Sequence, residues 1–337
     1  MEPTTLTRAR AGDELAFREL TDPYRRELEV HCYRMLGSLT DAEDMLQETL
    51  LAAWRGLSSF EERASLRAWL YRIATNRCLN ELRYHGRRIP AEPVPPFEPP
   101  EPTRRGMLTW LEPYPEIPDM AQGPEARYDA AESIELAFVS ALQRMPPRQA
   151  AALILRDVLG FSTDEVAAML RSGPVAVKGL LQRARVSLGQ QRDADRAPRP
   201  APGAERDIAR RFADAYLAAD IDGLIELLTD DAWLCMPPAP HEYCGADAIR
   251  AFLRASFRYR GQTPVYVLPA RVNGQTAFGS YVGTSGIGDA ALPGGIFVLT
   301  MAGDRIGVLT RFHLAATRYP RYGLPEALDV RKHHCPF

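Results

Sequence analysis

The chain has 337 residues, of which 46% are hydrophobic and 25% charged, and its formal net charge is −2. This length leaves room for two or three domains, and the near-neutral charge excludes a uniformly basic nucleic-acid binder, so local charge has to decide. Five scattered cysteines without a C-x-x-C pair argue against a disulfide framework or a cysteine-built zinc site and favour a cytoplasmic protein. The N-terminus lacks an apolar core and no apolar run reaches about 18 residues, so we expect neither a signal peptide nor a membrane span.

Residues 6–86 are predicted to form an all-helical domain, because apolar side chains such as Leu66, Leu70 and Ile73 recur at helical spacing. Residues 87–128 are predicted to be a linker, since eleven prolines between positions 90 and 124 cannot sustain a helix. Within it lies WLEPYPE (110–116), and a plain spacer does not need two large aromatic side chains. We expect Trp110 and Tyr114 to anchor the linker on the first or on the last domain.

Helical character resumes over residues 129–191, where the stretch 146–188 has the pattern of a helix-turn-helix. Gly160 ends one helix, Ser162 or Thr163 with Glu165 can cap the next, and a Ser-Gly-Pro break precedes a third. That third helix is expected to bury Val175, Val177, Leu180 and Leu181. Residues 141–192 hold eight Lys or Arg against three Asp or Glu, which favours binding to DNA phosphates. A helical bundle with a solvated basic face is the alternative.

A short linker over 192–206 precedes a predicted α+β domain over 207–320 and a tail over 321–337. Its expected elements are helices over 207–229 and 245–257, followed by antiparallel strands over 265–272, 276–283, 295–302 and 305–316. In the tail, His333-His334-Cys335 is expected to be a frayed end rather than a metal site. We expect no metal and no cofactor.

Two helical stretches of the first domain carry distinct charge patterns. DAEDMLQETLLAAW (41–54) has an acidic stripe opposite an apolar face, which indicates either a solvated surface or a basic protein partner. RASLRAWLYRIATNRCLNELRYH (63–85) sets five arginines and three aromatic residues against one acid. Such a mixture suits a platform for single-stranded nucleic acid, although Trp69 and Tyr71 can equally be core residues.

These blocks resemble known protein regions. DAEDMLQETLLAAW with LRAWLYRIATNRCLNELR (66–83) is similar to region two of bacterial sigma factors, and residues 146–185 are similar to their region four. The short form, without other regions, resembles the extracytoplasmic-function group over roughly residues 10–188. The resemblance implies docking on the clamp of RNA polymerase, capture of a flipped base of the −10 element by residues 57–65, and reading of the −35 element.

The family pattern assigns expected roles to individual positions. Polymerase binding falls on Asp41, Glu43, Asp44, Gln47 and Glu48. Contacts to the −10 element fall on Arg63, Arg67, Trp69, Arg72, Asn76 and Arg77. Contacts to the −35 element fall on Ser172, Val175, Lys178, Gly179, Gln182, Arg183 and Arg185. Gly179 departs from the family, which usually has a polar residue there, so base reading at that point is expected to be weaker or indirect.

Residues 209–253, the strands after them and RYGLPEAL (321–328) resemble the SnoaL-like cone, in which helices fold over a curved antiparallel sheet. Actinobacterial long sigma factors carry such a domain, and a motif like WLEPYPE recurs among them. Its candidate pocket residues are Trp233, Met236, His241, Tyr243, Arg311 and His313. Because some SnoaL-like proteins are cyclases or isomerases, Asp231 and the last four of these also count as catalytic candidates, beside a ligand sensor and an interaction module without ligand.

The sequence thus predicts a multidomain sigma factor: two all-α domains and an α+β cone that regulates them in cis. It is expected to act by recruitment and not as an enzyme. Core RNA polymerase and promoter DNA are the expected partners, with either a small ligand or an intramolecular contact at the cone. Two alternatives stay open: a ligand-sensing helix-turn-helix regulator, and a SnoaL-like cyclase or isomerase fused to DNA-binding domains.

Overall fold

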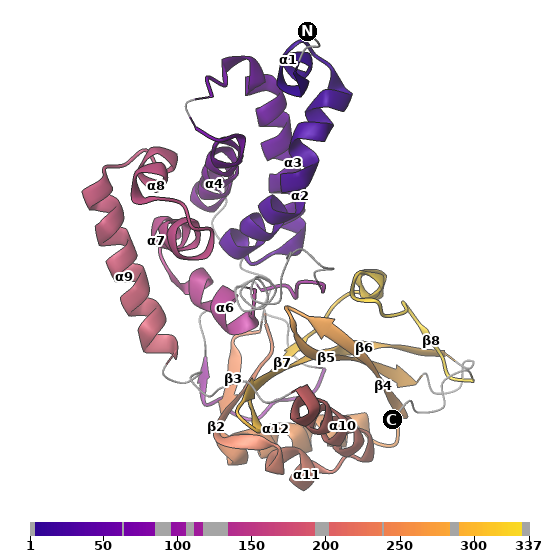
Figure 1. Ribbon diagram of the computed structural model, residues 1–337. Coiled ribbons are helices and arrows are strands. Elements are labelled where there is room, and N and C mark those ends of the chain that lie inside the picture. Colours follow the sequence, from indigo (N-terminus) through magenta and orange to yellow (C-terminus); the bar gives the residue numbers. More distant parts are fainter. Residues whose placement is uncertain are drawn as a thin grey trace. The chain divides into compact units, whose positions relative to one another are not determined.

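The structure of this protein is a computed structural model. It describes residues 4–62, 64–84, 96–105, 111–116, 134–192, 202–237, 239–283 and 290–331. Internal contacts place residues 1–88 with 138–192 in one unit, and residues 89–137 with 193–337 in the other. The first unit is helical, and the second is built on a single sheet (Figure 1). By its contacts, the linker therefore belongs to the second unit, together with the C-terminal part of the chain.

The N-terminal half of the first unit contains four helices: α1 (Thr5–Arg10), α2 (Glu14–Leu36), α3 (Leu39–Gly56) and α4 (Leu66–Tyr84). Side chains cap their starts, because Asp13 accepts from the amide of Ala16 and Ser38 from that of Asp41. Gly37 ends α2 in the left-handed conformation. The predicted helical character of this stretch is confirmed.

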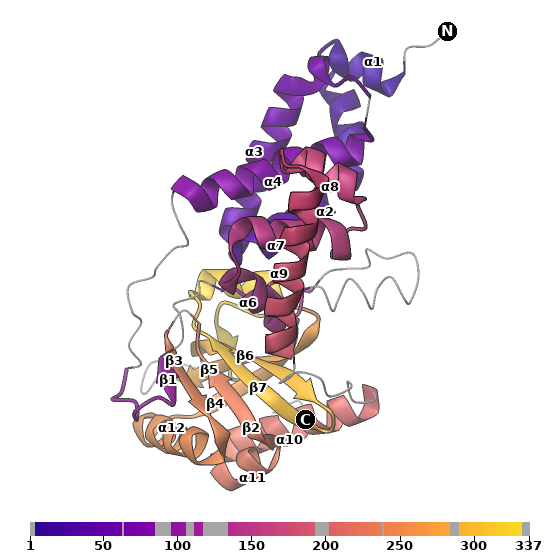
Figure 2. The same cartoon turned by 90° about the vertical axis from the view of Figure 1, so that its left-hand side faces the viewer.

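The second half of this unit contains α6 (Leu136–Arg144), α7 (Pro147–Leu153) with a π-helical turn (Ile154–Val158), α8 (Thr163–Met169) and α9 (Pro174–Arg192). Gly160 has a φ of 75°, and Ser162 and Glu165 form a capping box at the start of α8. The helices α7 and α8 pack against α4, as Figure 2 shows. The expected helix-turn-helix elements are present, with α9 as the helix after the turn.

One expectation for α9 was wrong. Val177 and Leu181 are buried, but Val175 is 83% exposed. Val175 is the second residue of the helix and Val177 the fourth. Side chains two positions apart on a helix point in different directions, so Val177 faces the core and Val175 does not. An apolar side chain is therefore left on the surface at the N-terminal end of α9.

The second unit is built on one sheet with the order β1-β3-β2-β7-β6-β5-β4. Its strands are β1 (Arg104–Arg105), β2 (Leu228–Cys235), β3 (His241–Cys244), β4 (Val265–Val272), β5 (Gln275–Gly283), β6 (Ala290–Ala302) and β7 (Arg305–Phe312), and a short β8 (Leu328–Asp329) pairs with β6. A fully antiparallel sheet was expected, but β2 and β7 pair in parallel, so the sheet is mixed.

Three helices cover one face of this sheet: α10 (Pro202–Ala218), α11 (Ile221–Glu226) and α12 (Gly245–Arg260) (Figures 1 and 2). The expected single helix over 207–229 is broken where Ala219 has a φ of 55° and Asp220 caps α11. The core between helices and sheet includes Phe212, Tyr216, Phe252 and Phe297. A turn of 3-10 helix (Ala316–Tyr322) follows β7. This is the α+β cone that the sequence predicts.

The described parts of the proline-rich linker form part of the cone. Arg104 and Arg105 pair as β1 with Glu242 and His241 of β3, and Pro115 forms an isolated bridge with Val272 of β4. The linker thus reaches the sheet at both of its outer strands. A linker that serves only as a spacer would make no such pairings.

Candidate functional site

The acidic face of α3 lies on the surface of the first unit. Asp44, Gln47 and Glu48 are exposed, and Asp41 and Glu43 are half-buried. Leu46 and Leu50, on the opposite side of the helix, are buried. Glu48 has a cationic neighbour on α4, because its carboxylate lies 3.9 Å from a guanidinium nitrogen of Arg77. The five residues predicted for polymerase binding therefore lie together on one helix, and three of them are exposed.

The residues predicted to contact the −10 element have different surroundings along α4. Arg72 and Arg77 are exposed, whereas Trp69 is only 7% exposed and packs against Phe60, with 5.0 Å between ring centroids. The structure assigns Trp69 to the core, where its ring is not free to stack on a base. Arg63 lies outside the described residues. Trp69 therefore packs against the stretch that follows α3, at Phe60.

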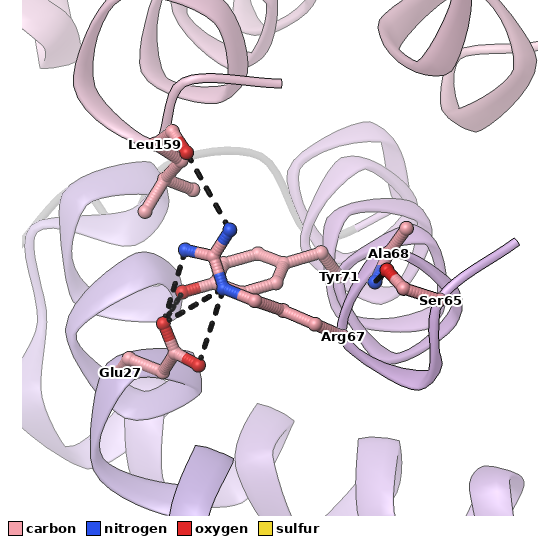
Figure 3. A network of polar contacts seen from close by, with 6 residues as sticks. All are labelled: Glu27, Ser65, Arg67, Ala68, Tyr71 and Leu159. Atoms are coloured by element: carbon pink, nitrogen blue, oxygen red, sulfur yellow. Dashed lines mark hydrogen bonds and ion pairs between the residues drawn. The ribbon is translucent and has the colours of Figure 1, made fainter. Parts of the chain in front are cut away.

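Arg67 is half-buried and is held by polar contacts, which Figure 3 shows. Its guanidinium bonds Glu27 of α2 at 3.1 and 3.2 Å, and the Tyr71 hydroxyl donates to the same carboxylate at 3.0 Å. Burial, and then the neighbouring Glu27 charge, raise the pKa of Tyr71 well above its ordinary value. Tyr71 thus stays a neutral donor, and the carboxylate holds Arg67 from one side.

Residues of the helix-turn-helix hold Arg67 from the other side. The guanidinium donates to the carbonyl of Leu159 at 3.5 Å and lies 4.8 Å from the ring centroid of Phe161. Further along α4, the side-chain amide of Asn76 donates to the carbonyl of Met169 at 3.2 Å. In this unit, therefore, the helix-turn-helix occupies two of the side chains that were predicted to bind the −10 strand.

The face of α9 predicted to read the −35 element is largely open. Val175, Lys178, Gln182 and Arg183 are exposed, whereas Ser172 and Gly179 are half-buried. A Cβ atom on Gly179 would meet only the Arg183 guanidinium, at 3.5 Å, which is ordinary contact distance. Arg185 differs from its neighbours, because both Asp157 carboxylate oxygens bind it at 2.7 and 2.8 Å. Arg185 is thus committed to an ion pair within the first unit.

Tyr114 of the WLEPYPE segment is completely buried in the cone. Its amide donates to the Asn273 side-chain oxygen at 2.7 Å, and its carbonyl accepts from the Asn273 amide at 2.8 Å. The side-chain nitrogen of Asn273 donates to the carbonyl of Ile134 at 2.6 Å. One turn residue, with a φ of 55°, therefore binds both Tyr114 of the linker and Ile134, which precedes α6. Trp110, the other predicted anchor, lies outside the described residues.

Further polar contacts surround Tyr114. The buried Glu112 carboxylate binds Arg318 at 2.7 Å, the Tyr322 hydroxyl donates to the Pro113 carbonyl at 3.0 Å, and Glu116 lies 3.3 Å from Arg271. A buried Glu112 carboxylate without a cationic partner would be strongly destabilising. The ion pair with Arg318 therefore favours the arrangement in which the linker packs against the cone. We call residues 111–116 with these contacts the linker clasp.

The cone contains a pocket of about 860 Å³, lined mainly by apolar and aromatic side chains. Three of the six predicted pocket residues line it: Met236, Arg311 and His313. The other three lie elsewhere in the cone. Trp233 is covered by the Arg104 guanidinium at 4.3 Å, His241 is buried beside β1, and the Tyr243 hydroxyl donates to the Pro100 carbonyl at 3.0 Å. The linker segment around β1 therefore covers this second group.

The pocket-lining residues that sequence reasoning missed include Phe97 and Glu112 from the linker, Arg260 from α12, and Arg318 after β7. In the sequence, Arg260 is not distinguishable from the exposed Arg254 and Arg258 on the same helix. The linker residues were missed because composition indicated a spacer. Only the two aromatic residues of WLEPYPE signalled that the linker packs against a domain.

No helix among the described residues combines the length and the apolar character of a membrane span. Among the same residues, no group of three or more His, Cys, Asp or Glu side chains is arranged to ligate a metal. The His333-His334-Cys335 run lies outside the described part of the chain.

Comparisons with known proteins agree with this geometry. The sequence matches the Sigma-70 region 2 family over residues 20–88 and the Sigma-70, region 4 family over residues 135–188. It is 43% identical to the ECF RNA polymerase sigma factor SigG of Mycobacterium tuberculosis over 324 residues, which are 95% of this chain and 86% of that protein. With SigM of the same organism it shares 35% identity over 182 residues, 53% of this chain and 79% of SigM. The crystal structure of the M. tuberculosis extracytoplasmic function sigma factor SigJ has the same fold, with a TM-score of 0.62, 23% identity and coverage of 91% of this chain and 99% of that one.

Proposed function

Because this chain belongs to the extracytoplasmic-function family of RNA polymerase sigma factors, we propose that it binds core RNA polymerase and directs it to promoters. The supporting observation is that one unit carries both an exposed acidic face on α3 and an exposed basic face on α9. A free-standing regulator has no need of the first, and an enzyme has no need of either. The protein is thus proposed to act in the cytoplasm, where RNA polymerase works.

Each face has a proposed role. The polymerase clamp is bound by five residues of α3: Asp41, Glu43, Asp44, Gln47 and Glu48. The −10 strand is contacted by the exposed residues Arg72 and Arg77. Arg67 and Asn76 join them once the helix-turn-helix releases these two side chains. At the −35 element, Val175 contacts base edges with Ser172 and Gln182, since an exposed valine methyl suits the methyl group of thymine. Lys178 and Arg183 contact phosphates. These roles extend over proposed domains at 6–86 and 129–191.

Polymerase capture tests the first role. Immobilised core RNA polymerase is expected to retain the wild-type chain and to lose the Asp44→Arg variant, because a cation in the acidic face opposes the basic clamp. The matched control is Glu19→Arg, which makes the same charge change at an exposed position on α2. Equal retention of both variants, or no retention of the wild type, would refute the proposed docking face.

The cone is proposed to regulate the sigma domains in cis by holding the linker that connects them. Sigma factors of this family must extend between the −10 and −35 contacts, and the linker clasp shortens the free part of the tether. Support comes from the complete burial of Tyr114 and from the two bonds that Asn273 makes to it. We propose that the clasp restrains the free protein and that polymerase competes for the released linker.

Transcription in vitro tests the regulatory role. A chain that ends after Gln191, without the second short linker or the cone over 207–320, is expected to transcribe more than the full-length protein from the same template. Lower activity of the truncated chain, with polymerase capture intact, would instead make the cone an activator. Either result is compared at equal occupancy of polymerase, so that changes in docking are not mistaken for regulation.

Catalysis by the cone is not part of the proposed function. Among the described residues that line the pocket, Glu112 is the one carboxylate, and Arg318 holds it at 2.7 Å. Asp231 does not line the pocket, and burial raises the pKa of Tyr243 to about 12, which disfavours it as a base. The pocket thus has the size and lining of a binding site, and the one carboxylate among its described lining residues is held in an ion pair.

A further inference from the structure

The pocket of the cone has an excess of positive charge. Its charged lining residues, among those described, are Arg260, Arg311 and Arg318 against Glu112. The Glu112–Arg318 pair is satisfied internally. His313 adds no charge at neutral pH, since partial desolvation and the Arg311 cation lower its pKa. Two guanidinium groups, those of Arg260 and Arg311, therefore face an otherwise apolar space without a carboxylate.

Both arginines border an aromatic floor. The Arg311 guanidinium carbon lies 5.3 Å from the ring centroid of Phe297, and that of Arg260 lies 4.6 Å from Phe257. Tyr216 connects the two sides, with its ring 4.9 Å from Phe297 and 5.7 Å from Phe257. Tyr216 and Phe257 line the pocket themselves, whereas Phe297 lies in the core, and aromatic lining beside two cations suits an apolar ligand with an anionic group.

The hydrogen bonds of these arginines are incomplete. Arg311 donates from Nη2 to the Gly294 carbonyl at 2.7 Å, and Arg260 donates from Nη1 to the Tyr216 carbonyl at 3.2 Å. The Nε atom of each is buried and has no partner among the described residues. Each guanidinium has five N–H donors, of which the carbonyls of Gly294 and Tyr216 take only one in each residue. An anionic group in the pocket would supply further acceptors and a counter-charge.

We propose that the cone pocket binds a small organic acid: a molecule with an apolar, preferably aromatic, body and a single anionic head group held by Arg260 and Arg311. The body fills the space between Phe97, Phe252, Phe257 and Met236, and 860 Å³ accommodates a molecule of drug-like size. A neutral molecule of the same shape leaves both cations uncompensated and binds more weakly.

The linker takes part in this site. Phe97, Leu111 and Glu112 all line the pocket, so a bound acid contacts the linker as well as the sheet and α12. The two events are coupled reciprocally. If docking of the linker raises the affinity of the pocket for the ligand, the ligand stabilises the docked linker by the same free energy. This step rests on the regulatory role proposed above, whereas binding of the acid does not.

Two fluorescent dyes with the same ring system provide the test: anilinonaphthalene sulfonate, which carries an acid, and N-phenylnaphthylamine, which does not. The full-length chain is titrated with each. Arg311→Met and Arg260→Met are each expected to weaken sulfonate binding at least about tenfold, since a charge-assisted hydrogen bond is worth about 1.5–3 kcal/mol. Binding of the neutral dye is expected to stay unchanged. Arg254→Met, at an exposed position of α12 outside the pocket, is the matched control and should alter neither dye.

Several results would overturn the inference. These are no binding of the sulfonate by the wild type, unchanged sulfonate binding in both pocket variants, or an equal loss of both dyes in variants that still unfold cooperatively. If Arg311→Met does not fold, Arg260→Met decides alone, and Arg311→Lys, which keeps a cation, is expected to retain most of the sulfonate affinity. Failure of dye binding leaves polymerase capture by the acidic face of α3 untouched, so the two proposals are tested separately.

Discussion

The guanidinium of Arg67 and the carboxylate of Glu27 are joined by three hydrogen bonds, at 3.1, 3.2 and 3.4 Å, between α4 and α2 (Figure 3). Arg67 is at the same time packed on Phe161 from the helix-turn-helix. A side chain proposed to bind promoter DNA is thus held inside the first unit. Release of Arg67 requires both the loss of an ion pair and the withdrawal of the helix-turn-helix, which links DNA binding to opening of the unit.

Removal of the Glu27 charge is expected to strengthen binding of single-stranded DNA. In Glu27→Gln the amide can still accept from Tyr71, but Arg67 loses its counter-charge, so its release costs less. We expect a gain in affinity of about two- to fivefold for a mixed-sequence single strand, the range of a partly exposed ion pair. Fluorescence anisotropy of a labelled oligonucleotide measures it.

The control for this change is Glu29→Gln on the same helix. Glu29 pairs with Arg26 at 2.9 Å and not with Arg67, so it reports the general effect of removing one negative charge. An equal gain in both variants would mean that net charge, rather than release of Arg67, controls binding. A decrease with Glu27→Gln would show that Glu27 orients Arg67 for DNA instead of withholding it.

The salt dependence of duplex binding should separate Lys178 from Arg185. Each phosphate contact contributes about 0.9 to the slope of log affinity against log salt. Lys178→Gln is expected to lower the magnitude of that slope by about this amount. Arg185→Gln should change it less, because Asp157 already neutralises Arg185 at 2.7 Å. A mixed-sequence duplex suffices, since the effect does not depend on sequence. Equal changes in both variants would show that the Asp157 pair opens on binding.

Periodicity in the sequence predicted most of the helices and four strands of the cone, because those elements have a regular face toward a core. Val265–Val272, for example, was predicted with its observed bounds. Strands β2 and β3 were missed: residues 228–229 were read as the end of a helix, and β3 has only four residues. The parallel pairing of β2 with β7 joins strands far apart in the sequence, so no local pattern reports it.

The candidate sites divide in the same way. The acidic face of α3 and the open face of α9 follow from helical spacing, and the structure places both on the surface. The linker clasp does not follow from spacing, because it depends on Asn273 binding a segment 159 residues away. Likewise, the pocket cations Arg260 and Arg311 become recognisable only when the structure shows which arginines have a carboxylate partner.

Asn273 allows the clasp to be loosened without a change in the turn. Asn273→Gly tolerates the positive φ of 55° but removes the acceptor for Tyr114 and the donor to Ile134. We expect faster hydrogen exchange at the Tyr114 amide and higher transcription from the full-length chain. Asn273→Asp keeps the acceptor and loses only the donor, so exchange at Tyr114 should change less. Unchanged exchange and transcription in Asn273→Gly would remove the clasp from the regulatory mechanism.

Buried His31 predicts a dependence of stability on pH. Its Nε2 lies 2.9 Å from the Thr75 hydroxyl, and burial, followed by the Arg34 and Arg67 cations, lowers its pKa from 6.5 to about 3. Below pH 6.5 the unfolded chain therefore binds a proton that the folded chain rejects, so stability is lost as the pH falls. From about pH 7 to about pH 5 this residue alone should lower the free energy of unfolding by about 2 kcal/mol.

Urea unfolding of the wild type and of His31→Gln, followed at several pH values above about 5, checks this expectation. The Gln side chain keeps a nitrogen that can bind Thr75 but does not titrate. Over the same interval, the unfolding free energy of His31→Gln should therefore fall by about 2 kcal/mol less than that of the wild type. Carboxylates that titrate at the lower end contribute equally to both proteins and cancel in the difference. If the two curves are parallel, His31 takes up its proton in the folded state. In that case the contact between α2 and α4 must open to water well above pH 3, and the first unit is less tightly closed than its Arg67 and Asn76 contacts indicate.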